Sequence, residues 1–328
     1  MADIQVQFEK FHDVIHVDYD MSTDLRDSRD VVLDLIRKQL KEKKQPLFRE
    51  LHQGSYKMKT GVKPIDNREY DIDIGLRFDI DSKEHDAATV RRWVYEAVKD
   101  HTKVCLDRGP CVRVVYQAGY HLDLVTYSVQ ETSGTDRYRL AHKTNGWRDA
   151  DPPKLLEHVD AARKAFDGTE DGRTQTDQFR RIVRYLRRWD DVHNAEEGNS
   201  KPTGLAFVLL SCNHLAPQWF LDRRPDDRTA LEQLCRLAAV TSGRLVANKP
   251  TPEYEDMFAR LTEDDMTVLK ERFGSLAEAL WQAGVTVDPV KACQLLQPHL
   301  GHDFPVPTPE DSGKKTKAPA IITSSASA

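Results

Sequence analysis

A predicted strand with two carboxylates on one face is the feature that most constrains this chain. Residues 69–78 read EYDIDIGLRF, in which Ile72 and Ile74 alternate with Asp71 and Asp73. Because successive side chains of a strand point to opposite faces, the two aspartates share one face and the isoleucines share the other. Neighbouring carboxylates repel each other when ionised, and Mg²⁺ or Mn²⁺, which prefer oxygen ligands, relieves that repulsion. The pattern therefore predicts a metal site on a rigid strand.

A third carboxylate is predicted on a later strand. Residues 119–127 read GYHLDLVTY and place Asp123 inside an apolar run, where a carboxylate is costly unless it is paired or bound to metal. Three such acids can hold two ions about 4 Å apart, an arrangement that stabilises the attacking and leaving oxygens of phosphoryl transfer. His121 shares the face of Asp123. It either hydrogen-bonds within the site or, more commonly for a histidine, only packs there.

A Gly-Ser pair precedes the first two acids. Gly54 and Ser55 follow a predicted strand at residues 47–52. Glycine lets a phosphate approach the backbone closely, and the serine hydroxyl and nearby N–H groups can bind phosphate oxygens. Taken alone, a Gly-Ser pair is more often a plain turn, and an Asp-x-Asp pair is more often a solvated strand face. The combination favours a phosphate-binding metal site.

The motif set resembles a known superfamily. Gly54-Ser55, Asp71-x-Asp73 and Asp123 resemble the nucleotidyltransferases that include polymerase β, poly(A) polymerase and 2′-5′-oligoadenylate synthetase. The fuller pattern QGSYKMKTGV…EYDIDIGL is similar to the bacterial cGAS/DncV-like branch, the CD-NTases, and the similarity runs over residues 8–300. The resemblance implies an α/β (α+β) fold, with a polymerase-β-like lobe around a mixed sheet and a helical lobe like that of poly(A) polymerase or oligoadenylate synthetase.

The resemblance also implies roles for individual residues. Asp71, Asp73 and Asp123 would hold two Mg²⁺ ions, with Mn²⁺ as a substitute, and Asp123 would be the general base. The triphosphate of the donor nucleotide would lie at Gln53, Gly54 and Ser55.

Two residues of the helical lobe complete the predicted site. The pattern R-x-L-R-R-W…K-P-T-G-x-A-F resembles the family's helical lobe, in which a Lys or Ser/Thr at a helix start reaches the triphosphate across the cleft. This similarity assigns Lys201 and Thr203 to nucleotide binding. The family more often has Ser-Ser at positions 203 and 204, so the second hydroxyl is missing here.

The predicted division of the chain has three parts. Residues 1–150 would form the catalytic lobe, residues 151–303 the helical lobe that closes the cleft, and residues 304–328 a flexible tail rich in Pro, Ser, Lys and Ala. By resemblance, the tail of some CD-NTases is engaged by an accessory protein of CBASS anti-phage defence.

Composition excludes several other classes. The 328 residues contain no apolar run near the 18–20 residues that cross a bilayer and no signal-peptide pattern, so a cytoplasmic protein without membrane contact is expected. Five scattered cysteines without a C-x-x-C pair argue against a disulfide framework and against zinc. The net charge of −5 argues against broad binding of duplex DNA, and hence against direct activation by DNA.

The predicted function is synthesis of a cyclic di- or trinucleotide messenger from NTPs, with ATP as one substrate. Cyclisation follows from the resemblance alone. The alternatives are a transferase that makes linear oligoadenylate or tails RNA, an antitoxin-type transferase that modifies a protein, and an inactive nucleotide sensor. Antitoxin-type transferases are usually much smaller, and RNA tailing favours a basic groove. The sequence does not determine the bases, the ring size, the linkage or the activating signal.

Overall fold

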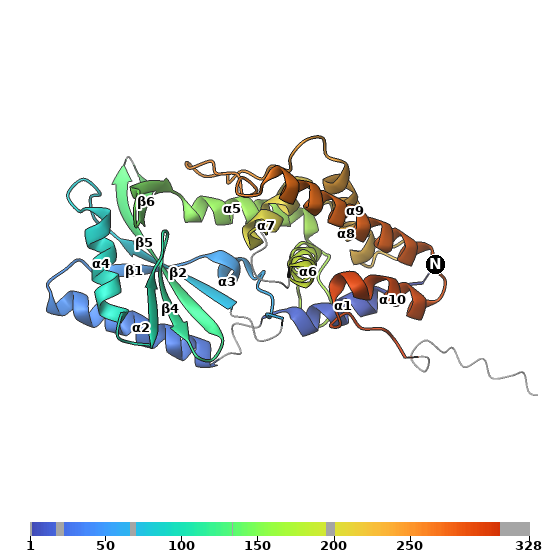
Figure 1. Ribbon diagram of the computed structural model, residues 1–328, viewed down its shortest axis with the longest axis horizontal. Helices are drawn as coiled ribbons and strands as arrows, with labels where there is room; N and C mark the ends of the chain where they lie inside the picture. Colours follow the sequence, from blue (N-terminus) through green and yellow to red (C-terminus); the bar gives the residue numbers. More distant parts are fainter. Residues whose placement is uncertain (1, 18–22, 66–69, 133, 195–200, 309–328) are drawn as a thin grey trace, which may run out of the picture.

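The protein has a sheet lobe and a helical lobe side by side (Figure 1). The computed structural model describes residues 2–17, 23–65, 70–132, 134–194 and 201–308. The left half of Figure 1 holds the strands with two long helices, and the right half holds the remaining long helices except α5, which runs between the halves. The α/β (α+β) architecture with a mixed central sheet is therefore confirmed.

The sheet lobe is built on seven strands. They are β1 (Phe48–His52), β2 (Tyr70–Phe78), β3 (Val104–Asp107), β4 (Val112–Tyr116), β5 (Tyr120–Thr132), β6 (Thr135–His142) and β7 (Gly146–Ala150). The spatial order is β1-β2-β5-β4-β3, and β6 and β7 extend the sheet from β5. Only the β2–β5 pair is parallel among these strands.

Two helices cover the apolar face of the sheet. α2 (Thr23–Glu42) and α4 (Ala87–Val98) bury their hydrophobic stripes against the isoleucines of β2 and the leucines of β5. Ile72 and Ile74 are 5% and 3% exposed, as the alternation predicts. The opposite face, which carries the aspartates, is therefore left for the site.

The helical lobe surrounds α6. Its long helices are α5 (Pro152–Arg163), α6 (Gln178–His193), α7 (Gly204–His214), α8 (Asp227–Val240), α9 (Glu263–Val285) and α10 (Pro289–Leu300). Each begins at an Asp or Thr whose side chain accepts a backbone N–H of the first turn. Asp151, for example, accepts the N–H of Lys154 at 3.0 Å and caps α5.

Two segments at opposite ends of the chain pack in the helical lobe, although the predicted division assigns one to the catalytic lobe and the other to the tail. α1 (Gln5–Ile15) packs in the core of the helical lobe, beside α6 and α8, although it opens the chain. Phe304 is fully buried, and its ring lies 5.1 Å from that of Phe8 and 5.2 Å from that of Phe11. The helical core thus extends past residue 303 and takes in the start of the predicted tail. Residues 309–328 of that tail lie outside the described residues.

A buried polar network joins the helices of this lobe. The Arg181 guanidinium is fully buried and donates to both oxygens of Asp227, each at 2.7 Å. The hydroxyl of Tyr185 donates to the same carboxylate at 3.0 Å. The side chain of Gln5 on α1 accepts the backbone N–H of Asp227 at 2.9 Å. A buried charge needs such complete pairing, and the network fixes α1, α6 and α8 relative to one another.

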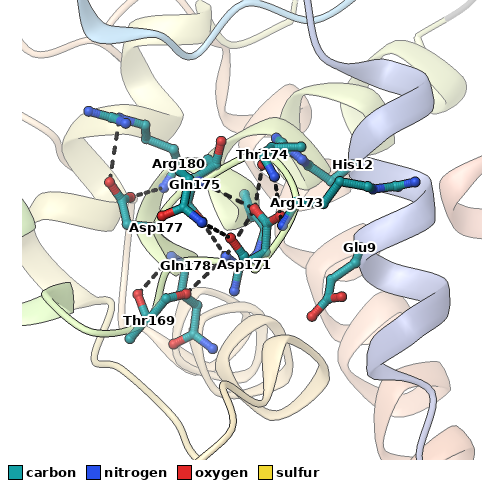
Figure 2. A network of polar contacts seen from close by, with 12 residues as sticks. Glu9, His12, Thr169, Asp171, Arg173, Thr174, Gln175, Asp177, Gln178 and Arg180 are labelled. Atoms are coloured by element: carbon teal, nitrogen blue, oxygen red, sulfur yellow. Dashed lines mark hydrogen bonds and ion pairs between the residues drawn. The ribbon is translucent and has the colours of Figure 1, made fainter.

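The turn before α6 is held by Asp171. Its carboxylate accepts backbone N–H groups of Arg173 at 3.0 Å and Thr174 at 2.6 Å (Figure 2). These bonds lower the pKa of Asp171 although burial opposes the shift. Figure 2 shows the turn next to α1, with His12 and Glu9 on the neighbouring helix. The contacts stabilise a loop and involve no residue of the predicted site.

Among the described helices, none combines the length and apolarity that a membrane crossing needs.

Candidate active site

The parallel pairing of β2 and β5 brings the predicted acids together. Asp73 lies opposite Asp123, and Asp71 lies opposite His121, so the four side chains form a square on one face of two adjacent strands. The three carboxylates line a cavity of about 650 Å³ that also includes residues of the helical lobe. Residues 50 apart in sequence therefore share one site because their strands pair in parallel and in this register.

Asp73 is the most strongly perturbed acid of the site. Burial, together with the negative charges of Asp123 and Asp71, raises its pKa to about 7. A carboxylate in such a position gains from a nearby cation, which offsets both the lost solvation and the repulsion. The structure thus supports the predicted requirement for positive charge at this point.

The pKa of Asp71 is shifted in the opposite direction to that of Asp73. Burial opposes its ionisation, but the contact with His121 and the charges of Arg113 and Arg187 outweigh burial and lower its pKa. The Nε2 atom of His121 contacts Oδ1 of Asp71, and His121 is only 3% exposed. His121 is therefore part of the polar site, which is the less common of the two roles that the sequence allowed.

Asp123 is held by an arginine that the sequence analysis did not single out. Arg113 on β4 donates from Nε to Oδ1 of Asp123 at 2.7 Å and from Nη2 to Oδ2 at 2.6 Å. The antiparallel register places the two residues directly opposite each other. The sequence offered one signal for this role of Arg113, namely a charged residue among the valines of residues 112–115. The sequence could not show that Arg113 pairs with Asp123, because that pairing depends on the order of the strands.

The Gly-Ser pair opens a short helix instead of a plain turn. α3 (Gly54–Met58) begins beside the acids, and Gln53 precedes it in extended conformation. Gly54 has φ of 64°, and a Cβ atom added there would lie 2.1 Å from Oδ2 of Asp73. Only glycine permits this approach. Gln53 is buried, and its side-chain oxygen accepts the hydroxyl of Tyr127 at 2.9 Å, so this residue positions the start of α3.

Lys201 and Thr203 line the same cavity from the helical lobe. Nζ of Lys201 lies 3.1 Å from the carboxylate of Asp191 on α6. The hydroxyl oxygen of Thr203 accepts the N–H of Ala206 at 3.2 Å and caps α7, which leaves its own proton available as a donor. All eight residues assigned from the sequence to the site therefore border one cavity.

Further cavity residues come from segments without a helical or strand pattern. The segment after α8 folds back on itself, with Asn248 paired to Asp256, and contributes Lys249, Thr251 and Glu253. In Figure 1 this orange segment extends over α5 toward the sheet lobe. Its tip, a Pro-rich stretch in the sequence, offered no periodic signal that could have assigned it to the site.

The residues fit a divalent cation. Three carboxylates converge, Asp71, His121 and Asp123 place ligand atoms within 4.8 Å of one another, and the backbone at Gly54 leaves room only for the Asp73 carboxylate. Oxygen donors with one imidazole suit Mg²⁺ and Mn²⁺. Arg113 already satisfies part of the charge of Asp123 and would share that carboxylate with an ion.

Comparison with known proteins agrees with this geometry. The family model for the nucleotidyltransferase domain of "Cyclic GMP-AMP synthase DncV-like" proteins matches residues 48–127, the stretch that contains Gln53, Gly54, Ser55 and the three aspartates. A cyclic GMP-AMP synthase of Escherichia albertii is 26% identical over 193 residues. That match covers 56% of this chain and 41% of the length of the relative.

Solved structures share the whole fold. Vibrio cholerae DncV cyclic AMP-GMP synthase, in complex with the linear intermediate pppA(3′,5′)pG, superposes with a TM-score of 0.69 at 13% identity, over 91% of this chain and 96% of that one. E. coli MS115-1 CdnC, in complex with a HORMA protein, gives 0.66 at 14% identity, over 92% and 98%. At this identity the likeness establishes the fold, and the family match establishes the catalytic domain. Residues 48–127 therefore match the nucleotidyltransferase domain of DncV-like proteins, and the chain shares the fold of DncV and CdnC, in line with the family that the sequence motifs indicated.

Proposed function

We propose that this protein joins NTPs into a cyclic di- or trinucleotide by metal-dependent nucleotidyl transfer. The observation that carries the proposal is the convergence of Asp71, Asp73 and Asp123 beside Gly54, inside a cavity between two lobes. Carboxylates on two adjacent strands, next to the start of α3, suit in-line phosphoryl transfer.

The three aspartates would hold two Mg²⁺ or Mn²⁺ ions. When bound, such ions lower the pKa of an attacking ribose hydroxyl and neutralise charge on the α-phosphate and the departing pyrophosphate. The protein's own part is mainly positioning. β2 and β5 fix the carboxylates on a paired, rigid surface, and the Arg113 pair orients Asp123, which we assign as general base for the hydroxyl proton.

The triphosphate would lie between the two lobes. Gly54 and Ser55 offer the first N–H groups of α3 and a hydroxyl from one side. Lys201 and the O–H of Thr203 approach from the other side, and Arg187 of α6 lines the same cavity. Positive charge from the helical lobe would complement the phosphates, and the carboxylates would remain available for the metal ions.

Cyclisation is proposed by analogy with the relatives. V. cholerae DncV was solved with a linear dinucleotide intermediate, and the E. albertii relative is a cyclic GMP-AMP synthase. We accordingly propose ATP and a second NTP as substrates, joined in two successive transfers at the same acids. By the same analogy with the HORMA complex of CdnC, we propose a CBASS accessory protein as partner. The proposed NTP substrates support a cytoplasmic location for this reaction, which we also propose.

Mass spectrometry of the products tests the proposal. The purified chain is incubated with all four NTPs and Mg²⁺ or Mn²⁺, beside the double variant Asp71→Asn/Asp73→Asn. A cyclic product that is absent from the variant is the expected result, and its mass identifies the bases. A linear ladder would instead favour oligoadenylate synthesis or RNA tailing.

If the purified chain forms no product, a second experiment tests whether an accessory protein is required. The same incubation is repeated with the host lysate, in which an accessory protein would be present. Product formed only by the wild-type chain under these conditions would support the proposal with a required partner. Absence of product in both arms, with the protein folded and NTP binding intact, would favour the inactive sensor.

A further inference from the structure

A side-chain cation already lies between two of the carboxylates. Nη2 of Arg113 is 2.6 Å from Oδ2 of Asp123 and 3.9 Å from Oδ2 of Asp71. Nε of the same guanidinium is 2.7 Å from the other oxygen of Asp123. Arg113 therefore engages both oxygens of the third acid and approaches the first acid as well. Its side chain is 16% exposed, so water screens this interaction little.

An ion shared by Asp71 and Asp123 would need the same oxygens. A planar guanidinium that donates to both carboxylate oxygens is among the strongest side-chain pairs. A divalent ion that approaches Asp123 comes within a few ångströms of the Arg113 guanidinium. At that distance the two positive charges repel each other strongly. Ion binding at Asp123 must therefore compete with Arg113, which donates to both oxygens of that carboxylate.

We propose that Arg113 is a resident counter-ion of the metal-free site. It holds Asp123 in place when no ion is bound and lowers the affinity of the site for a divalent ion, which must weaken the Arg113–Asp123 pair in order to bind. Arg113 is thus a positioning residue that acts through Asp123. The inference rests on the proposed function only in that the acids bind metal.

Metal affinity measured without nucleotide tests this role. The full chain is titrated with Mn²⁺, and free Mn²⁺ is followed by electron paramagnetic resonance for the wild type, Arg113→Met and Arg113→Lys. Arg113→Met should bind Mn²⁺ about tenfold more tightly, because it loses a positive charge beside two ligands. Arg113→Lys keeps the charge but not the two-pronged geometry and should fall between the other two proteins.

Two controls separate the local effect from general damage. Arg77→Met removes a comparable arginine pair, in which Arg77 donates to both oxygens of Asp136 outside the cavity, and should leave Mn²⁺ affinity unchanged. In an Asp123→Asn background, Arg113→Met should tighten Mn²⁺ binding much less, because the competition for Asp123 is gone and only the charge near Asp71 is removed. Equal or weaker Mn²⁺ binding by folded Arg113→Met and Arg113→Lys, relative to wild type, would overturn the inference.

The outcome is separable from that of the proposed function. Tighter Mn²⁺ binding by Arg113→Met in a chain that makes no nucleotide product with or without lysate would uphold the role of Arg113 and refute cyclic nucleotide synthesis. Unchanged Mn²⁺ binding in a chain that makes a cyclic product would refute the role of Arg113 alone.

Discussion

At Gly54, the space that any other side chain would occupy is already filled by a carboxylate. The Cβ of an alanine would lie 2.1 Å from Oδ2 of Asp73, and φ of 64° is unfavourable for any residue with a Cβ atom. The residue therefore combines two constraints, a left-handed backbone and direct contact with a proposed metal ligand. Asp190 of α6 lines the same cavity and is constrained by burial instead.

Gly54→Ala should reduce product formation by about 100-fold or more, because a displacement near 1 Å of a reacting group has effects of that size. Product is quantified by mass spectrometry at saturating NTP. The matched control is Gly119→Ala, at φ of 83°, where an added Cβ would meet no described atom within 4 Å. Gly119→Ala shares the backbone strain and should retain most activity. Near-wild-type activity of Gly54→Ala would contradict the proposed site.

Asp190→Asn should alter the pH dependence of stability. Burial raises the pKa of Asp190 to about 7, and the lowering effect of Lys201 does not cancel this shift. The folded state therefore binds a proton that the unfolded state releases near pH 4, so the contribution of Asp190 to stability is lost as pH rises from about 4 to 7. The free energy of unfolding of the asparagine variant, relative to wild type, should increase from pH 5 to pH 8.

Urea unfolding at four pH values checks this expectation. Asparagine can still accept the hydrogen bond that Nδ2 of Asn194 donates to Asp190 at 2.7 Å, so packing is preserved. Asp160→Asn, at an exposed carboxylate, serves as the control. A stability difference between wild type and Asp190→Asn that is the same at all four pH values would refute the assignment.

At the scale of elements, helix starts shape the cavity. α3 and α7 both begin at the cavity, and each start combines a structural and a proposed binding role. Thr203 illustrates the overlap, because its oxygen caps α7 while its proton remains available for a phosphate. Sequence similarity assigned Thr203 to nucleotide binding, and the cap is an additional role that its position in the helix explains.

Thr203→Ala should lower the free energy of unfolding by about 1 kcal/mol, the usual effect of losing an N-cap. Thr203→Ser keeps both the acceptor and the donor and should remain close to wild type in stability and in NTP affinity. Urea unfolding and NTP binding by calorimetry measure the two properties. Wild-type stability of Thr203→Ala would show that the cap contributes little.

At the scale of the whole molecule, arginines of α6 connect the lobes. Arg184 donates to the carbonyl of Lys59 at 2.7 Å, Arg187 to that of Thr60 at 2.6 Å and Arg188 to that of Lys63 at 2.9 Å. These carbonyls follow α3 directly in the chain. The helical lobe therefore positions the segment next to the proposed phosphate site.

Arg184→Met should destabilise the protein by about 1–3 kcal/mol, because the carbonyls of Lys59 and Gly61 each lose a donor. Amide hydrogen exchange of residues 59–63 should become faster, since the segment would be held less tightly to α6. Arg137→Met, at an exposed arginine, is the control. Unchanged exchange at residues 59–63 would mean that other contacts suffice to hold the lobes together.

Local patterns in the sequence predicted much of this protein. The alternation around Asp71 and Asp73 specifies a strand and the face of each side chain, because a strand has a period of two residues. The Gly-Ser pair was located correctly, but its conformation as the start of a helix was not. These features depend on residues close in sequence, which is why the sequence determined them.

The remaining features depend on contacts between distant residues. The pairing of Arg113 with Asp123 requires β4 to lie beside β5 in a particular register, and a shift of one residue would send Arg113 to the other face. The burial of α1 and Phe304 together, and the approach of the segment around Glu253 to the cavity, join parts of the chain hundreds of residues apart. The sequence by itself predicted which residues border the cavity and which face of the strands they occupy, through motifs and local periodicity. Only the tertiary structure decided which side chains neutralise, cap and surround them, because packing and strand register set those neighbours.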